Sequence, residues 1–216
     1  MIIKKQTVSF DDIKPSLQTG DIVLMHGQYI SSHVIEVIEH SLWSHAAIVV
    51  LADDIGVDSD EKILLWESNL NTPVKDVILK KSKDGPQLVS LHERMKRNFE
   101  SKDDSQFAVR HLYFERSQEM FSTFIQVIKN VHASKFPRTK EEMEDPVKGR
   151  FFGIQTSQKF MFCSELVAYT YIQLGLLSGI HPTNSYIPSD FSERLSVGLL
   201  NRAYLGNEIV IDTKSL

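Results

Sequence analysis

Cysteine is nearly absent from this chain of 216 residues, since Cys163 is the only one. A single cysteine excludes an intramolecular disulfide and a cysteine-rich zinc site. Long apolar runs are also absent: no stretch approaches the roughly 18 apolar residues that a membrane span requires. The amino-terminal segment, residues 1–16, lacks the apolar core of a secretory signal. We therefore expect a cytoplasmic protein that is not integral to a membrane.

The sequence also lacks an excess of basic charge, because 24 lysines and arginines face 28 aspartates and glutamates, for a net charge of −4. A general nucleic-acid-binding protein usually carries a strongly basic face, so we expect no nucleic-acid partner. The chain contains no internal repeat and no low-complexity segment. Its length is enough for one substantial core, and we expect a single domain over residues 1–216.

The stretch FMFCSELVAYTYIQLG, residues 160–175, predicts a buried helix with Cys163 in its first turn. Apolar residues recur along one face at helical spacing, and others widen that face. Gly175 is a suitable stop, because glycine adopts the left-handed conformation at little cost. A thiol at the positive end of a helix dipole, beside a histidine, can have a pKa well below the free value of about 8.5. The alternative interpretation is a buried cysteine that acts as a small apolar side chain.

Two strand-like stretches on either side of an acidic turn predict a hairpin: residues 43–51 and 62–68. If Leu51 pairs with Glu61, then His45 stands directly opposite Glu67. Directly opposed residues of antiparallel strands have Cβ atoms roughly 4.5–5.5 Å apart, so their side chains can touch. A slip of one residue would break this opposition, because it turns the two side chains to different faces.

Further elements are predicted from apolar periodicity and turn residues. The strand candidates are residues 20–27, 74–79, 87–91, 107–114 and 208–212. The helix candidates are residues 31–42 and a segment that Ser117 caps and that runs to Ala133. Residues 92–105 are charged on nearly all sides and predict a short exposed helix or loop with solvated basic residues. Residues 135–157 predict a loop, and loops of that length often serve as lids or binding segments.

Catalysis by a thiol requires a thiolate, a base close to it and a polar group that orients the base. Cys163, His45 and Glu67 are candidates for these functions. Their spacing alone is a weak signal, because the chain has eight histidines and many acidic residues. Glu165 is an alternative acid partner, although the first turn of a helix also suits it as a complement to the dipole. His45 could equally be a core histidine that a carbonyl satisfies.

A metal site is the rival interpretation of the histidines, because four of them lie within 20 residues: His26, His33, His40 and His45. His33 and His40 are seven residues apart on the predicted helix, whereas helical ligands usually sit three or four apart, and the chain has no HExxH motif. We therefore expect no metal and no other cofactor. Trp43 and Trp66 flank the candidate histidine and glutamate, either as core residues or as the lining of a pocket.

Three blocks of the sequence resemble the circularly permuted branch of the NlpC-type, papain-like superfamily: TGDIVL, WSHAAIVV and FCSELVAY. In this branch the histidine strand precedes the cysteine helix, which is the order found here. The lecithin:retinol acyltransferases are more distant relatives with a similar core. The resemblance covers about a third of the chain, and residues 69–157 lie outside it.

The resemblance implies an α+β fold in which an antiparallel, barrel-like sheet packs on the helix that carries the cysteine. It implies Cys163 as the nucleophile, His45 as the general base and Glu67 as the orienting residue, with a thioester intermediate. The oxyanion hole would contain the backbone N–H of Cys163 and a second donor, either His26 or a tyrosine such as Tyr29.

By the same resemblance, the expected activity is that of a cysteine peptidase or amidase that cleaves small, cell-wall-derived peptides or other amino-acid-containing substrates. One alternative is a thiol-dependent lipid acyltransferase or lipid hydrolase. It would need an apolar channel or a docking segment, and residues 31–42 have an apolar stripe but no basic face. Another alternative is a non-catalytic binding module on the same fold, which the presence of all three candidate residues disfavours.

Overall fold

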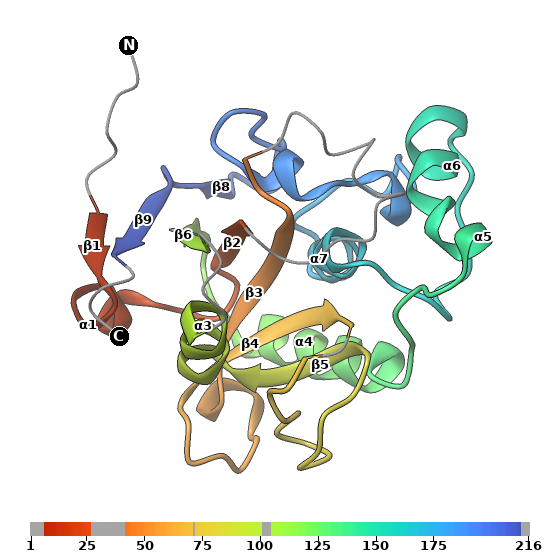
Figure 1. Ribbon diagram of the computed structural model, residues 1–216. Coiled ribbons are helices and arrows are strands. Elements are labelled where there is room, and N and C mark those ends of the chain that lie inside the picture. The colour runs from red at the N-terminus through yellow and green to blue at the C-terminus, as the bar shows by residue number, and fades with distance from the viewer. Residues whose placement is uncertain (1–6, 27–41, 71, 101–104, 213–216) are drawn as a thin grey trace.

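The computed structural model describes residues 7–26, 42–70, 72–100 and 105–212. Its centre is a seven-stranded sheet in the order β1-β9-β6-β2-β3-β4-β5 (Figure 1). The β1–β9 contact is parallel, and the other pairings are antiparallel. The strands are β1 (Thr7–Ser9), β2 (Ile22–His26), β3 (His45–Leu51), β4 (Ile63–Asn69), β5 (Gly85–Ser90), β6 (Gln106–Arg110) and β9 (Ile209–Asp212).

The expected α+β class with a mostly antiparallel sheet is confirmed. The sheet is not a closed barrel, because β1 and β5 form its two edges. The barrel-like form that the resemblance implied therefore stays a prediction. A separate pair of short strands, β7 (Leu112–Tyr113) and β8 (Tyr204–Leu205), lies outside the main sheet.

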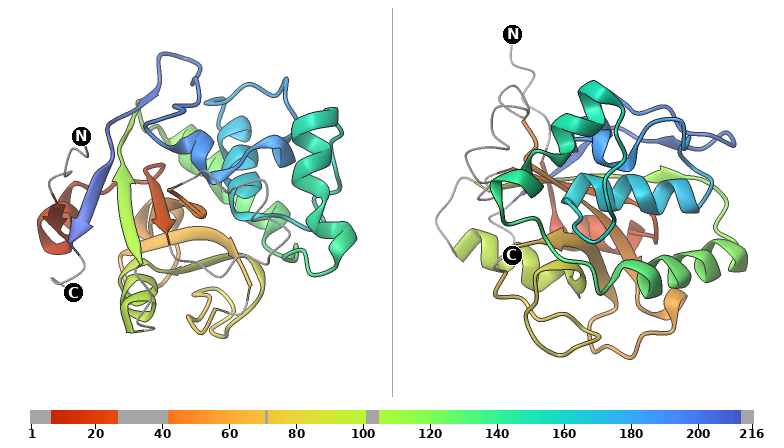
Figure 2. Two further views of the ribbon diagram at one scale, coloured as in Figure 1. Left: turned by 45° about the horizontal axis from the view of Figure 1, so that its top comes forward. Right: turned by 90° about the vertical axis from the view of Figure 1, so that its right-hand side faces the viewer.

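Both faces of the sheet are buried, so successive residues of a central strand enter two different cores. In β2, Ile22 and Leu24 belong to one core, and Val23 and Met25 belong to the other. Helices α4 (Gln118–Val131) and α7 (Cys163–Gln173) contribute to the first core. Helices α1 (Phe10–Ile13) and α3 (Leu91–Glu100) contribute to the second. The right-hand view of Figure 2 shows α4 and α7 together on one side of the sheet.

Helix α7 begins at Cys163, as predicted, and packs against β3 and β4. Two polar contacts tie its interior to the sheet side: the Trp66 indole donates to the Thr170 hydroxyl at 3.2 Å, and the Tyr171 hydroxyl donates to the Gly20 carbonyl at 2.6 Å. Gly175 follows the helix with a φ of 70°, in the left-handed conformation that the sequence predicted. Trp66 is thus a core residue.

The β3–β4 hairpin forms, but its predicted register is wrong by two residues. Leu51 pairs with Ile63 rather than with Glu61, and Ile48 pairs with Trp66. The difference arises in the acidic turn, where the 3-10 helix η2 (Asp53–Ile55) and Gly56 close the chain more widely than a simple hairpin loop. A shift of two preserves the face of every side chain, since the side-chain period of a strand is two.

The segment 135–157 was expected to be mostly loop, and this is wrong. It contains α5 (Lys140–Met143) and α6 (Asp145–Phe152). The sequence signals for them are local: Thr139 and Glu142 form a capping box, and Gly153 ends α6 with a φ of 64°. Figure 1 places both helices beside α7 and far from the β1–β9 edge.

Of the other predicted elements, some are confirmed and others are wrong. Ser117 caps α4 by accepting from the Met120 N–H, as predicted. Residues 74–79 do not form a strand, because the buried Asp76 carboxylate accepts backbone N–H groups of Ile78, Leu79 and Leu88 and folds the segment into a turn. The predicted helix at residues 31–42 lies almost wholly outside the described residues. The described residues also include the 3-10 helices η1 (Lys14–Ser16), η3 (Thr183–Ser185) and η4 (Pro188–Phe191).

No helix within the described ranges is long and apolar enough to cross a membrane.

Candidate active site

The three candidate catalytic residues meet where the start of α7 reaches the sheet. His45 is the first residue of β3, Glu67 lies near the end of β4 and Cys163 is the first residue of α7. All three are buried, and Cys163 is 8% exposed. Packing of α7 against β3 and β4 therefore brings together residues that are far apart in the sequence.

His45 and Glu67 are in direct contact: Nε2 of the imidazole lies 2.8 Å from Oε2 of the carboxylate. The two residues are diagonal neighbours across β3 and β4 rather than directly opposed, because of the two-residue shift in register. Diagonal neighbours on one face are still within reach of long side chains. The predicted contact is thus present, although by a different pairing.

Cys163 forms a hydrogen bond with His45, and the backbone N–H groups of Ala46 and Ser164 donate to its sulfur. Because Nε2 of His45 is engaged by Glu67, Nδ1 is the ring nitrogen that remains for the thiol. Burial alone would raise the pKa of Cys163, but the positive charge of His45 and these hydrogen bonds outweigh it and lower the pKa. The arrangement favours a thiolate.

The pKa of His45 is raised, whereas that of Cys163 is lowered. Burial would lower it, but the charge and hydrogen bond of Cys163, together with Glu67, raise it to about 9. A raised imidazole pKa and a lowered thiol pKa describe one event, the transfer of the thiol proton to the ring.

Arg94 completes the cluster, and sequence reasoning missed it. Its Nε donates to Glu67 at 3.0 Å from Oε1 and 3.2 Å from Oε2, and its Nη1 donates to the side chain of Asn98. Burial would raise the pKa of Glu67, but the charge of Arg94 and then the contact with His45 lower it to about 2. Glu67 is therefore ionised at every ordinary pH.

The expectation that the basic residues of 92–105 are solvated is wrong for Arg94. A signal was present in the spacing, because Leu91, Arg94, Met95 and Asn98 recur at three and four residues and share the buried face of α3. Arg94 stands between two apolar residues of that stripe. A charge in such a position needs a buried partner, and Glu67 is that partner.

The alternative acid, Glu165, bonds elsewhere. It accepts from the Phe162 N–H and the Thr183 hydroxyl, each at 3.3 Å. Burial raises the pKa of Glu165 to about 8, so it is largely protonated at neutral pH. Glu165 therefore lies in the first turn, as predicted, but it meets the helix N-terminus through its hydrogen bond to the Phe162 N–H rather than mainly as a full charge.

The remaining candidates have simpler positions. His26 is exposed, and its Nδ1 lies 2.6 Å from the Leu42 carbonyl. Tyr29, His33 and His40 lie outside the described residues. The Trp43 indole donates to Glu208 at 3.0 Å.

Within the part of the chain that the structure describes, no three His, Cys, Asp or Glu side chains are grouped to hold a metal ion.

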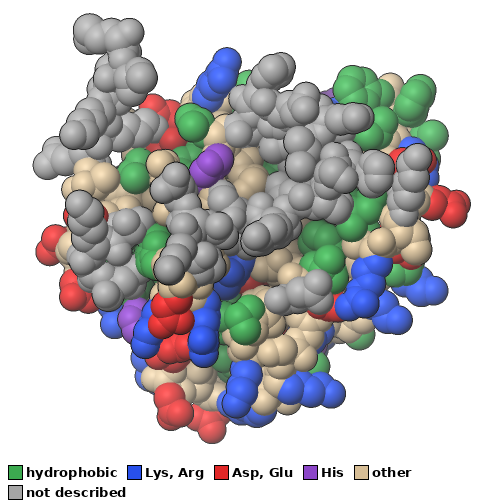
Figure 3. Space-filling view, viewed as in Figure 1, with side chains coloured by type: hydrophobic (Ala, Val, Ile, Leu, Met, Phe, Trp, Pro, Cys, Tyr) green, Lys and Arg blue, Asp and Glu red, His purple; other side chains and the backbone are tan. Residues whose placement is uncertain are grey.

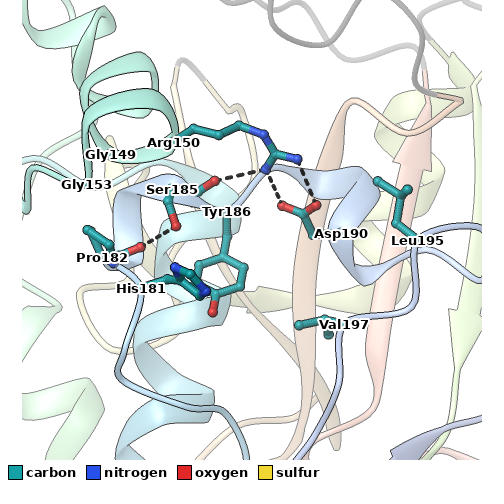
Figure 4. A pocket seen from close by; sticks show the side chains of 10 residues that line it. All are labelled: Gly149, Arg150, Gly153, His181, Pro182, Ser185, Tyr186, Asp190, Leu195 and Val197. Atoms are coloured by element: carbon teal, nitrogen blue, oxygen red, sulfur yellow. Dashed lines mark hydrogen bonds and ion pairs between the residues drawn. The ribbon is translucent and has the colours of Figure 1, made fainter.

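A pocket of about 310 Å³ lies between α6 and the segment from His181 to Val197 (Figure 4), and none of the three candidate catalytic residues lines it. It is linked to the first turn of α7 by one contact, in which the Ser164 hydroxyl donates to the Tyr186 carbonyl at 2.8 Å. Because Ser164 directly follows Cys163, the wall of the pocket is anchored one residue from the thiol.

Comparison with known proteins identifies no family for this chain. No family model matches the chain. No curated protein matches it either. Among solved structures it is similar to the metalloprotein yiiX of Escherichia coli O157:H7, with 18% sequence identity and a TM-score of 0.45 over 72% of this chain. The chain spans 64% of the length of that protein, and a likeness this weak carries no argument about function.

The reactivity of Cys163 tests the predicted thiolate. We expect the folded protein to react with iodoacetamide with an apparent thiol pKa below the free value of about 8.5. His45→Ala should raise that pKa, because burial of the thiol then acts without the imidazolium that offsets it. His92→Ala, which removes a histidine that stacks on Phe10, is the control and should change nothing. A thiol that reacts slowly at every pH, unchanged by His45→Ala, would rule out activation by histidine.

A double-mutant cycle tests the buried Arg94–Glu67 pair. Arg94→Met and Glu67→Gln should each lower the free energy of unfolding by roughly 3–5 kcal/mol, because each leaves one buried charge without its partner. The double variant should lose clearly less than the sum, measured by urea unfolding. Lys62→Met removes an exposed ion pair with Asp53 and should cost at most about 1 kcal/mol. Additive losses at Arg94 and Glu67 would show that the two charges do not support one another.

Proposed function

We propose that this protein is a cysteine hydrolase of the acyl-transfer type, with Cys163 as nucleophile, His45 as general base and Glu67 as the residue that orients the imidazole. The observation that supports it is the continuous contact from the Cys163 thiol through His45 to Glu67, with a pKa of the thiol that is lowered despite burial. Arg94 extends this chain of contacts as a positioning residue, because it holds Glu67 ionised.

The three residues suit both steps of such a reaction, the acylation of Cys163 and the hydrolysis of the thioester. The Cys163 thiolate would attack the substrate carbonyl carbon, and the His45 imidazolium would then give its proton to the leaving amine as the carbon–nitrogen bond breaks. Water, deprotonated by His45, would hydrolyse the resulting thioester and return the thiolate. Glu67 would remain ionised throughout and stabilise the imidazolium that forms before each proton transfer.

The oxyanion of the tetrahedral intermediate needs donors. The backbone N–H of Cys163 lies at the first residue of α7, where the amide groups of a helix point outward, and is one candidate. His26 is the second candidate within the described residues, and it would have to exchange its bond to the Leu42 carbonyl for one to the substrate.

For the substrate we propose the amide bond of a small peptide of the cell-wall type. The support is the resemblance of the three sequence blocks to the permuted NlpC-type branch, together with a core in which the cysteine helix packs on a mostly antiparallel sheet. The site chemistry itself requires only an activated carbonyl and a leaving group that accepts a proton.

Hydrolysis assays test this proposal. Purified protein should release the fluorophore from aminomethylcoumarin amides of short peptides, and Cys163→Ser should lower the rate at least about 100-fold while the circular dichroism spectrum stays the same. A covalent adduct on Cys163 should be visible by mass spectrometry after acid quenching. Activity that survives Cys163→Ser would contradict the proposed nucleophile, and cleavage of acyl esters with no detectable cleavage of any amide would contradict the proposed bond.

A lipid substrate is the second candidate, and exposed apolar side chains favour it. Phe151 and Phe152 at the end of α6 are 69% and 71% exposed, and Ile154 and Ile180 are also exposed. They are sequence neighbours of Arg150, Gly153 and His181, which line the pocket. Figure 3 shows hydrophobic side chains gathered over α6. Contiguous exposed apolar groups often mark a contact surface for a membrane or a partner.

Vesicle co-sedimentation separates the two candidates. If the substrate is a membrane lipid, the protein should pellet with phosphatidylcholine vesicles, and Phe151→Ser combined with Phe152→Ser should return it to the supernatant. Ile78→Ser removes an exposed apolar residue in the turn after β4 and is the matched control. Protein that remains in the supernatant with every vesicle composition would leave the peptide substrate as the better candidate.

A further inference from the structure

The pocket is connected to the first turn of α7, the turn that carries the candidate nucleophile, although Cys163, His45 and Glu67 do not line it. Two consecutive residues after Cys163 fasten its floor: Ser164 bonds to the Tyr186 carbonyl at 2.8 Å, and Glu165 accepts from the Thr183 hydroxyl at 3.3 Å. Two hydrogen bonds therefore connect the loop that carries Thr183 and Tyr186 to the first turn of α7. A ligand in this pocket would lie beside the helix turn that carries the thiol.

The opposite wall is equally fixed. The Asn184 amide donates to the carbonyls of Asp145 at 2.6 Å and Ile154 at 3.1 Å, which clamps α6 onto the loop. Gly149 allows this close approach, because a Cβ there would come within 2.7 Å of Asn184 Cγ. The pocket is thus preformed rather than a gap between loosely placed elements.

Two opposite charges face the interior of the pocket. Arg150 Nη1 lies 2.8 Å from Asp190 Oδ2, and Nη2 lies 3.3 Å from Oδ1. The Arg150 side chain is 34% exposed, so the pair is accessible to a ligand. Figure 4 shows the pair along one wall, with the rings of His181 and Tyr186 below it and Val197 to the side.

The pair restricts the chemistry of a ligand. A ligand with a single charge would satisfy one member and repel the other. A ligand with adjacent positive and negative groups satisfies both, since a guanidinium suits a carboxylate and a carboxylate suits an ammonium. The rings of His181 and Tyr186 and the aliphatic Leu195 and Val197 suit an apolar tether beyond the charged end.

We propose that this pocket binds a substrate end that carries an ammonium and a carboxylate on the same carbon, as a free α-amino-acid head group does, with Arg150 on the carboxylate and Asp190 on the ammonium. Such a head group stays intact when the amino acid is linked to the scissile bond through its side chain. The proposal rests on the proposed function for the reaction at Cys163, and the binding itself does not require the reaction.

Calorimetric titration of the full chain carrying Cys163→Ser tests the binding without turnover. The ligand is Nε-acetyl-lysine, and the comparison ligands are its α-amide, which lacks the carboxylate, and Nα,Nε-diacetyl-lysine, which lacks the ammonium. The zwitterion should bind at least about tenfold more tightly than either, because hydrogen bonds to charged groups are worth that much. Equal affinity for the three ligands, or no binding of the zwitterion up to about 10 mM, where affinity would be negligible, would overturn the proposal.

Variants assign the two halves of the pair. Arg150→Gln should abolish the preference for the acid over its amide, and Asp190→Asn should abolish the preference for the free amine over its acetyl derivative. Arg138→Gln, which removes an exposed arginine paired with Asp84, is the control and should preserve both preferences. Preferences that persist in Arg150→Gln and Asp190→Asn would also overturn the proposal. Asp190 also accepts the Ile187 N–H, so the Asn variant loses a structural contact. If Asp190→Asn fails to fold, the proposal is tested by the affinities of the three lysine derivatives for the protein with Arg150 and Asp190 intact.

The two proposals can fail separately. Selective binding without hydrolysis of any amide would refute the proposed function and leave the pocket assignment standing. Hydrolysis without selectivity for the zwitterion would do the reverse.

Discussion

Four ionisable side chains, Arg94, Glu67, His45 and Cys163, form a continuous buried chain on which the candidate site depends. Burying any one of these charges alone would cost several kcal/mol, so each is tolerable only because its neighbour is present. When the thiol proton resides on His45, the charges of these four side chains alternate between positive and negative. The arrangement stabilises a thiolate in a place where burial by itself would favour the neutral thiol.

Helix α7 connects this chain of charges to the rest of the molecule. Its body is buried on almost every side, which fixes its position, while its first turn presents Cys163 to His45 and fastens the pocket through Ser164 and Glu165. The candidate nucleophile and the wall of the pocket are therefore both connected to one buried helix. The neutral state of Glu165 fits this function, because a protonated carboxyl is less costly to bury than a charged one.

Local patterns predicted much of the framework. Residues 160–175 contain the whole signal for α7, including the left-handed Gly175 that follows it, and Ser117 marks the start of α4. The contact between His45 and Glu67 followed from strand periodicity, although the expected register was displaced by two residues. An error of two kept both side chains on one face, whereas an error of one would have separated them.

Spacing within short segments was enough to predict the class of fold, the helices α4 and α7 and the candidate nucleophile. The burial of Arg94 against Glu67, the bond between Glu165 and Thr183, and the placement of Arg150 and Asp190 at one pocket followed only from the packing of the folded chain. Each of these contacts joins segments distant in the chain. Whether a charged residue is solvated or buried depends on which distant element packs over it, and local periodicity does not contain that information.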